Sequence, residues 1–388
     1  KPIIELHEEK RVLIWEHLNQ LSNKHRRYSD AKWALPDNLI NSIENVAEQL
    51  APTNPFNLYQ HLFSNRDFDL YDENGDWEEQ QKKIEARRET AISEIFRLNG
   101  AEGVMRFADN VSAPNQVGSV LGTFSNDVFE TILLPHFLDT TENKHKALVS
   151  AFIWKRFWLK GWEWCDNLSK SDWTPKQLGQ FLAYLPFSGE TWGRASQYLQ
   201  AFESEYWTRT DANAYQSEGE LAGAIDKLIE HGRPHAAIHC LYRMHQNKQP
   251  IDANQCVRAL LAALSTDESS SNMDTYHITT LIKYLQTKSD VNQDDLFSVE
   301  WAYIPLLDGH RGTVPQLLEN RMATDPEFFC EIIRLIFRSE KEDASASGPT
   351  EQSKAIARNA WRLLDKWETP PGSQQNGSFS ADNFTKWL

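Results

Sequence analysis

Residues 228–238 read Leu-Ile-Glu-His-Gly-Arg-Pro-His-Ala-Ala-Ile, and this stretch decides how the rest of the chain is interpreted. An apolar helix end comes first, Gly232 interrupts it, and Pro234 starts the next helix. Glycine is favoured just after the last turn of a helix, and proline is tolerated in the first. The small side chains of Ala236 and Ala237 allow the second helix to pack closely on a neighbour. The stretch therefore predicts two helices joined by a tight turn.

The same rhythm continues on the carboxy-terminal side of this turn. Helices of about 12–14 residues, separated by connectors of about 3–8 residues, fit the sequence. They are expected at residues 218–231, 234–246, 252–264, 275–287, 293–307, 314–323 and 326–338. The polar segment 339–352 is interpreted as a flexible loop, residues 353–367 as a further helix, and 370–380 as a linker.

Toward the amino terminus the helices are less regular. Apolar residues at three- and four-residue steps predict helices at 3–27, 36–50 and 78–99, and Gly100 ends the last of these. Shorter helices are expected at residues 101–111, 114–123, 126–137, 144–160, 174–185 and 190–207. This half of the chain is therefore expected to be helical without a clear repeat.

We expect an all-α fold, and within that class an α-solenoid, which is a right-handed superhelical array of antiparallel helix pairs. No segment alternates convincingly between apolar and polar residues, and 17 Gly and 16 Pro are too few for the many turns of a sandwich or barrel. Short helices in a long series favour a solenoid over one bundle, because each pair can bury its apolar face only against its neighbours.

Three parts are expected along the 388 residues. Residues 1–210 form an irregular α-helical domain, and residues 211–338 form regular helical repeats. Residues 339–388 form a flexible loop, a helix and a linker to a missing carboxy-terminal part. Because the chain starts at Lys1 without Met and ends inside the expected start of a helix, we expect it to be a piece of a longer polypeptide.

Charge and cysteine content narrow the class of function. The formal net charge of −15 repels phosphate backbones, and the basic groups at 24–27, 82–88 and 155–156 are short enough to be solvated helix faces, so a nucleic-acid partner is not expected. The four cysteines form no CxxC pair, which indicates reduced structural thiols in a cytoplasmic protein. No apolar run reaches the ~18–20 residues needed to cross a bilayer, so no membrane partner is expected.

Two stretches carry a family resemblance. Residues 228–238 resemble the helix–turn–helix of tetratricopeptide-type or HEAT-like repeats over one repeat. Residues 300–307, Glu-Trp-Ala-Tyr-Ile-Pro-Leu-Leu, continuing to 325–329, Asp-Pro-Glu-Phe-Phe, resemble helical regions of very large bacterial proteins over roughly a third of the chain.

Many such bacterial proteins are similar to STAND-type signalling ATPases or antiphage-defence proteins. These carry an amino-terminal effector, a central NTPase and a carboxy-terminal helical sensor, so the resemblance implies a sensor or scaffold segment. No GxxxxGK[ST] occurs, and no nucleotide-site residue carries over.

Histidines near the decisive turn are the first candidate metal ligands. His231, His235 and His239 follow one another at four-residue steps, with Cys240 beside them and His245 beyond. Two histidines four apart on a helix can hold zinc. However, Gly232 and Pro234 separate His231 from the others, and Ala236 stands where HExxH has its glutamate. The pattern therefore favours surface or helix-end histidines, and no metal ligand is assigned.

Acidic clusters give two further candidates. In residues 65–78 a calcium loop with Gly75 at its sixth position would have Leu70 at its first and Gln81 at its twelfth, so both essential carboxylates are missing and a solvated acidic loop is favoured. Asp294, Asp295 and Glu300 could hold magnesium, but without a second acid-rich helix the pair is more typical of a helix N-terminus.

Aromatic residues supply the candidate partner-binding surface. Of the 14 Trp, most are expected in the core between helix layers. A solenoid also exposes a concave face, where Tyr and Trp serve as interface anchors. Tyr206 and Trp207, followed by Arg209, are the best candidates for such a patch, and Arg233 in the interhelical turn is the next.

The first hypothesis is thus a non-catalytic protein-recognition, sensor or scaffold segment of a larger bacterial, antiviral-defence protein, with no catalytic residue and no cofactor. Its partner would be phage-derived, regulatory, or another part of the parent polypeptide. One alternative is an all-α metal-dependent enzyme using Asp294 and Asp295, or His235 and His239. The other is a helical-repeat nucleic-acid binder, which would need a continuous basic groove.

Overall fold

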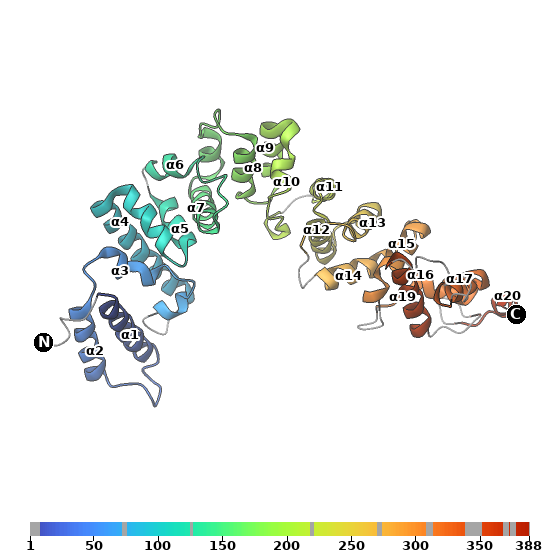
Figure 1. Ribbon diagram of the computed structural model, residues 1–388, viewed down its shortest axis with the longest axis horizontal. Coiled ribbons are helices and arrows are strands. Elements are labelled where there is room, and N and C mark those ends of the chain that lie inside the picture. The colour runs from blue at the N-terminus through green and yellow to red at the C-terminus, as the bar shows by residue number, and fades with distance from the viewer. Residues whose placement is uncertain are drawn as a thin grey trace, which may run out of the picture. The chain divides into compact units, whose positions relative to one another are not determined.

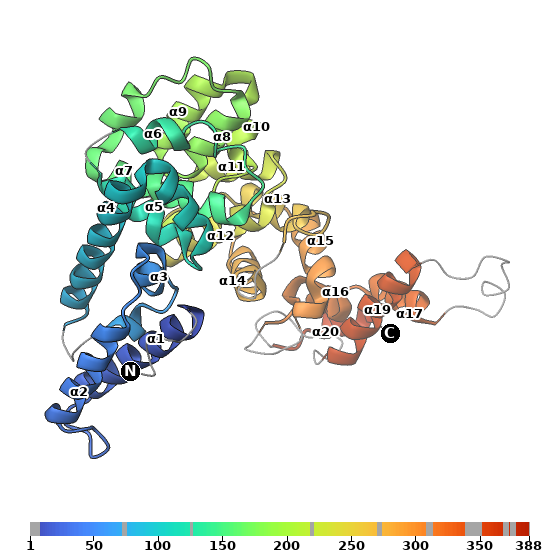
Figure 2. The same ribbon diagram turned by 60° about the vertical axis from the view of Figure 1, so that its left-hand side comes forward.

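The structure is a computed structural model of the chain, and it confirms the all-α class. It describes residues 8–71, 76–124, 127–217, 221–269, 274–307, 313–337, 351–367, 372 and 378–387. Within these ranges every regular element is a helix, and no β-strand occurs (Figure 1 and Figure 2). Residues 339–350 of the loop expected at 339–352 lie outside the described residues, and residues 351 and 352 are helical instead. Most of the linker expected at 370–380 also lies outside the described residues.

The chain divides into two compact units. The first comprises Lys1–Leu185 and Tyr198–Tyr206, and the second comprises Pro186–Gln197 and Trp207–Leu388. The sequence placed one boundary between residues 210 and 211. The structure divides the chain after Tyr206 and also assigns the segment 186–197 to the second unit, because its aromatic side chains pack there, as described below.

The first unit begins with a helix pair. Its helices are α1 (Glu8–Arg27), α2 (Asp37–Leu50), α3 (Pro55–Tyr59), α4 (Trp77–Asn110), α5 (Pro114–Thr123), α6 (Val128–Leu133), α7 (Asn143–Asn167) and α8 (Pro175–Ala183). Helices α1 and α2 pack together, and Trp15, Ala47 and Leu50 form their shared apolar core. Gly100 has a φ of 66° and kinks α4 at the point where the sequence predicted a helix end.

Two glycines allow α5 and α7 to lie in close contact. A Cβ atom added at Gly118 would lie 2.1 Å from the carbonyl oxygen of Leu148, and one at Gly122 would lie 2.6 Å from the Cβ of Lys155. Real Cβ atoms do not approach other atoms so closely. The four-residue spacing places both glycines on one face of α5. Because this face carries no side chain at these two positions, the backbone of α7 packs closely against it.

Most of α9 (Gly189–Leu199) belongs to the second unit, and most of α10 (Ser204–Trp207) belongs to the first. From residue 207 on, the described part of the second unit consists of a series of helices and two short 3₁₀ turns. Its elements are η5 (Ala214–Gln216), α11 (Ala222–Glu230), α12 (Pro234–Gln246), α13 (Ala253–Ala262), α14 (Asp274–Gln286), α15 (Gln293–Tyr303), η6 (Ile304–Leu306), α16 (Gln316–Thr324), α17 (Pro326–Ile336), α19 (Glu351–Lys366) and α20 (Ala381–Trp387).

Helices α11 to α15 pack in two rows. Each of them contacts the next helix in sequence, and α11 contacts α13, α12 contacts α14, and α13 contacts α15. Helices α11, α13 and α15 therefore form one row, and α12 and α14 form the other. The turn at 231–233 that predicted two joined helices indeed connects α11 to α12, with Gly232 at a φ of 73°.

The carboxy-terminal helices continue this core. Ala360 and Leu363 of α19 are buried in one cluster with Ile304, Leu318 and Ile332. Helix α19 packs on α17, and α20 packs on α16. The helix expected at 353–367 is thus present, but it belongs to the second unit and is not part of a separate linker segment.

Substitution at Gly118 tests the close contact between α5 and α7. We expect Gly118→Ala to lower the free energy of unfolding by about 1–3 kcal/mol or more, because the added methyl group meets backbone that cannot move away cheaply. Urea denaturation followed by circular dichroism measures this change.

Gly193→Ala is the matched control, because Gly193 lies inside α9 with nothing within 4 Å of an added Cβ. Here the helix propensity of alanine should leave stability unchanged or raise it by about 1 kcal/mol. Equal stability of Gly118→Ala and the unmodified chain would contradict the packing of α5 on α7.

Candidate functional site

The expected aromatic patch is buried. Tyr206 is 0% exposed and Trp207 is 2% exposed. The Trp207 ring packs against Phe187 and Trp192, with ring centroids 6.4 and 6.3 Å away. These rings are core side chains, which corrects the expectation that Tyr206 and Trp207 line an open face. Arg209, next to them, is half-buried.

Arg233 is used inside the second unit. Its Nε donates to Glu268 Oε1 at 2.8 Å, and its Nη1 donates to the carbonyl oxygens of Thr210 at 2.8 Å and Trp207 at 3.3 Å. Glu268 also accepts a 2.7 Å hydrogen bond from the backbone amide of His235, in the first turn of α12. The guanidinium therefore holds three chain segments together, and its donors are directed to these internal acceptors.

The acidic residues of α15 have separate roles. Asn292 caps α15, its side chain accepting from the backbone amides of Asp294 and Asp295 in the first turn. Glu300 is 0% exposed. Its carboxylate accepts from Gln286 Nε2 at 2.6 Å and from the backbone amides of residues 317 and 318 at 3.2 and 3.0 Å, at the start of α16. Burial raises the pKa of Glu300, and these hydrogen bonds oppose the rise.

Glu300 is thus a structural helix cap and lies in a different environment from the two aspartates. The grouping that the magnesium alternative needs is not formed. Within the described parts of the chain, the group of side chains suited to a metal ion lies on α12 and α14 instead.

The acidic loop 65–78 is only partly described, because residues 72–75 lie outside the described ranges. At its start, Asp67 forms an ion pair with the buried Arg88, with 2.5 Å between Oδ1 and Nη2. At its end, Asp76 caps α4 by accepting from the amide of Glu78 at 2.8 Å. The carboxylates of Asp67 and Asp76 therefore already bind protein groups.

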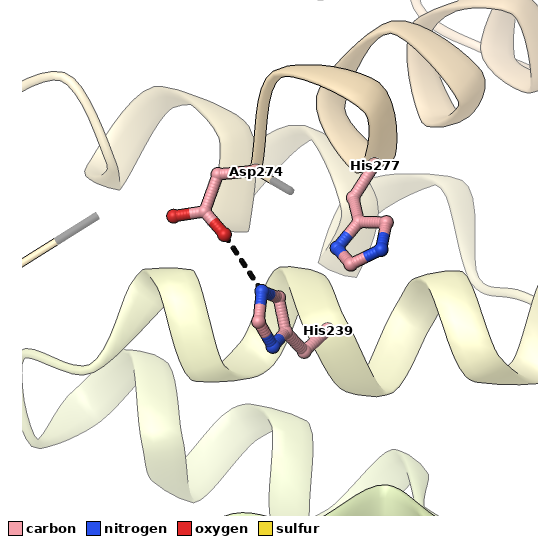
Figure 3. A group of neighbouring side chains, drawn as sticks. All are labelled: His239, Asp274 and His277. Atoms are coloured by element: carbon pink, nitrogen blue, oxygen red, sulfur yellow. Dashed lines mark hydrogen bonds and ion pairs between the residues drawn. The ribbon is translucent and has the colours of Figure 1, made fainter. Parts of the chain in front are cut away.

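Two histidines of α12 meet one aspartate of α14. His239 Nε2 lies 2.7 Å from Asp274 Oδ1, as the dashed line in Figure 3 shows. His235 Nδ1 lies 3.0 Å from Asp274 Oδ2, an ion-pair distance without hydrogen-bond geometry. His231 is separate from both, with its Nδ1 2.8 Å from the carbonyl oxygen of Lys227 at the end of α11. The sequence had grouped His235 with His239, and the structure adds Asp274.

His277 of α14 completes this group. Its ring lies edge-on to His239 with 4.7 Å between centroids (Figure 3). It also stacks on Tyr242, with 4.0 Å between centroids. Burial lowers the pKa of His277, the neighbouring His239 lowers it further, and Asp274 opposes the shift. The imidazole is therefore neutral at physiological pH. Its Nδ1 is buried and has no hydrogen-bond partner among the residues that the structure describes.

Aromatic side chains surround this cluster on the α12 and α14 row. We call them the aromatic strip, and it comprises Tyr215, His239, Tyr242, His245, Tyr276, His277 and Tyr284. Ring contacts join some of its members: Tyr242 contacts Tyr276 with 5.7 Å between centroids, and His245 contacts Tyr284 with 5.5 Å between centroids. The Arg243 guanidinium lies 4.3 Å from the centre of the Tyr215 ring. Tyr215 is 69% exposed and Tyr276 is 43% exposed, so the strip reaches solvent.

A cavity of about 690 Å³ lies in the first unit, between α1, the turn after α3, and α4. Trp15, Glu16, His61 and Arg87 are among its lining residues. The His61 ring lies edge-on to Trp15 with 5.1 Å between centroids. Burial, with a smaller effect of the Arg87 charge, lowers the pKa of His61 to about 4. The sequence interpretation missed this cavity.

The sequence interpretation also missed Asp274, His277 and Tyr242. Spacing offered a partial signal, because Tyr242 follows His239 by three residues and His277 follows Asp274 by three, which places each pair on one helix face. Nothing local indicated that these two faces meet.

Comparison with known protein families, with curated proteins and with solved structures finds no match for this chain. Among the described residues, no helix combines the length and the apolar character needed to span a membrane. The site must therefore be interpreted from its own geometry.

The depressed pKa of His61 predicts a pH dependence of stability. In the unfolded chain His61 has a pKa near the ordinary value of 6.5, and in the folded chain its pKa is only about 4. The contribution of neutral His61 to the free energy of unfolding is therefore fully present above pH ~6.5, and it is lost as the pH falls toward ~4. When the pH falls from about 7.5 to about 5.5, we expect His61 to account for a decrease of about 1 kcal/mol in the free energy of unfolding.

Urea denaturation at both pH values measures this loss. His61→Gln should show a pH-dependent loss smaller by that amount, and His17→Gln, at an exposed histidine of α1, should behave as the unmodified chain. An unchanged pH dependence in His61→Gln would contradict the buried neutral state.

Proposed function

We propose that this chain is a non-catalytic protein-recognition or scaffold segment of a larger bacterial protein, such as an antiphage-defence protein, and that its second unit binds a protein partner. The observation that carries the proposal is the aromatic strip. It is partly exposed, has members on η5, α12 and α14, and replaces the Tyr206 and Trp207 patch expected from the sequence.

The two-row packing of α11 to α15 supports the architecture that this function needs. We propose that the second unit is an α-solenoid of antiparallel helix pairs, in which α12 and α14 form one face. In solenoids, one row of helices commonly supplies an extended binding surface, and its residues come from successive repeats. The aromatic strip has this origin, since all its members except Tyr215 lie on α12 and α14, which are alternate helices of the series.

The chemistry of the strip suits protein recognition. Tyrosine offers a large rigid ring and a hydroxyl group, and it is enriched among residues that dominate binding energy. The rings of Tyr242 and Tyr276 contact each other, which limits the rotamer freedom that binding would otherwise remove. The net charge of −15 favours a partner with a basic surface, whether phage-derived, regulatory or another part of the parent polypeptide. We propose a cytoplasmic location for this interaction.

Site-specific photo-crosslinking tests the recognition surface. A photoreactive side chain placed at Tyr276 should capture a specific partner in phage-infected bacterial cells, and mass spectrometry identifies the captured protein. The same side chain at Trp361, a 51% exposed aromatic residue of α19, is the matched control. Capture of the same proteins at both positions, or of none at Tyr276, would contradict the proposal.

The captured partner then allows a quantitative test. Tyr215→Ala and Tyr276→Ala should each weaken its binding by about tenfold or more, because truncation of an interface anchor costs at least ~1–2 kcal/mol. Trp361→Ala should leave the affinity unchanged. Isothermal titration calorimetry measures all three, and equal affinities would exclude the strip as the binding surface.

A further inference from the structure

We propose that His239, Asp274 and His277 form a binding site for a divalent transition-metal ion of the zinc class. One nitrogen or oxygen atom from each of these residues lies within 4.8 Å of the atoms from the other two. The three side chains come from two adjacent helices and converge on one point, as Figure 3 shows. The proposal does not depend on the recognition function.

The donor set determines the class of metal. Two imidazoles and one carboxylate are a common protein ligand set for zinc, and they also suit other divalent first-row transition metals. Magnesium and calcium prefer oxygen ligands, so a site with two nitrogen donors discriminates against them. The site therefore takes a metal that accepts imidazole.

The geometry requires only a small rearrangement. Ligand atoms about 2.0–2.2 Å from a tetrahedral zinc ion lie about 3.3 Å from one another. His239 and Asp274 are already at 2.7 Å, in a hydrogen bond that the metal would replace. His277 must turn toward them, and the limit of 4.8 Å leaves about 1.5 Å to close, which rotation of a side chain covers.

The position of His277 is not explained by an ordinary ion pair. Asp274 alone accounts for the positions of His235 and His239. His277 is 9% exposed, and its Nδ1 has no hydrogen-bond partner among the described residues. Leaving a buried polar atom unsatisfied is costly, and a metal ion bound by this imidazole would remove the cost.

Groups around the three ligands hold them in place. His235 Nδ1 lies 3.0 Å from Asp274 Oδ2, on the oxygen that does not face His239. Tyr242 stacks on the His277 ring and supports one face of it. Such supporting groups orient ligands and raise metal affinity. The His239 side chain is 40% exposed, so remaining coordination positions face solvent, where water or a donor from another molecule can bind.

Zinc titration of the full chain tests the site. The chain should carry Cys330→Ser, because Cys330 is an exposed thiol that would bind zinc independently. Isothermal titration calorimetry should show one strong site per chain for Zn²⁺ and none for Mg²⁺ or Ca²⁺. Co²⁺ should give the visible absorption of a low-coordinate nitrogen and oxygen site.

Variants of the ligands locate the metal. His239→Ala and His277→Ala should each weaken zinc binding by about tenfold or more. His245→Ala is the matched control, because His245 lies on the same helix and in the same strip but outside the cluster. Its affinity should equal that of the unmodified chain. Circular dichroism and the melting temperature verify that each variant is folded. If His277→Ala does not fold, His277→Gln takes its place.

Two results would overturn the proposed site. One is that the chain with all three ligands binds zinc no more strongly than His239→Ala does. The other is that both His239→Ala and His277→Ala retain zinc binding in full. Because these titrations contain no protein partner, their failure leaves the recognition proposal untouched. Likewise, loss of a partner in Tyr215→Ala says nothing about zinc.

Discussion

The ion pair between Arg233 and Glu268 is the interaction on which the second unit depends. Arg233 donates to the carbonyl oxygens of Trp207 and Thr210 as well as to Glu268, and Glu268 also accepts from the amide of His235. The two side chains are 23% and 13% exposed, so their charges are largely desolvated. An ion pair in this setting is tolerated because further hydrogen bonds satisfy both groups. It fixes the loop after α13 against the first turn of α12.

This constraint positions the histidine cluster. Asp274, the first residue of α14, follows Glu268 by six positions in the sequence. Helix α14 packs along α12, so the carboxylate of Asp274 meets His235 and His239, and His277 follows one turn later. The polar cluster and the aromatic strip are therefore consequences of one packing arrangement. Polar side chains in such a contact require a defined register, because a slip of either helix would leave several buried groups without partners.

The sequence predicted what local interactions determine and missed what long-range packing determines. The turn at Gly232 and Pro234 followed from local sequence, and so did the break at Gly100, which the structure shows as a kink within α4, because backbone conformation at these residues depends on neighbours in the chain. The burial of Trp207 and the pairing of His239 with Asp274 could not be predicted in this way. Those features depend on residues 20 or more positions away, such as Phe187 and the α14 face. Arg233 was a candidate for partner binding, and the structure shows that its described acceptors, Glu268, Trp207 and Thr210, lie within the second unit.

The metal cluster and the aromatic strip share His239 and His277, and this overlap has a physical consequence. A metal bound by His277 would hold the ring on which Tyr242 stacks, and Tyr242 in turn contacts Tyr276 on the exposed part of the strip. Ordering these rings in advance reduces the entropy that a partner must remove on binding. If metal binding strengthens partner binding, partner binding must strengthen metal binding by the same factor. A partner that supplies a carboxylate or imidazole to the solvent-facing side of His239 would make this coupling direct.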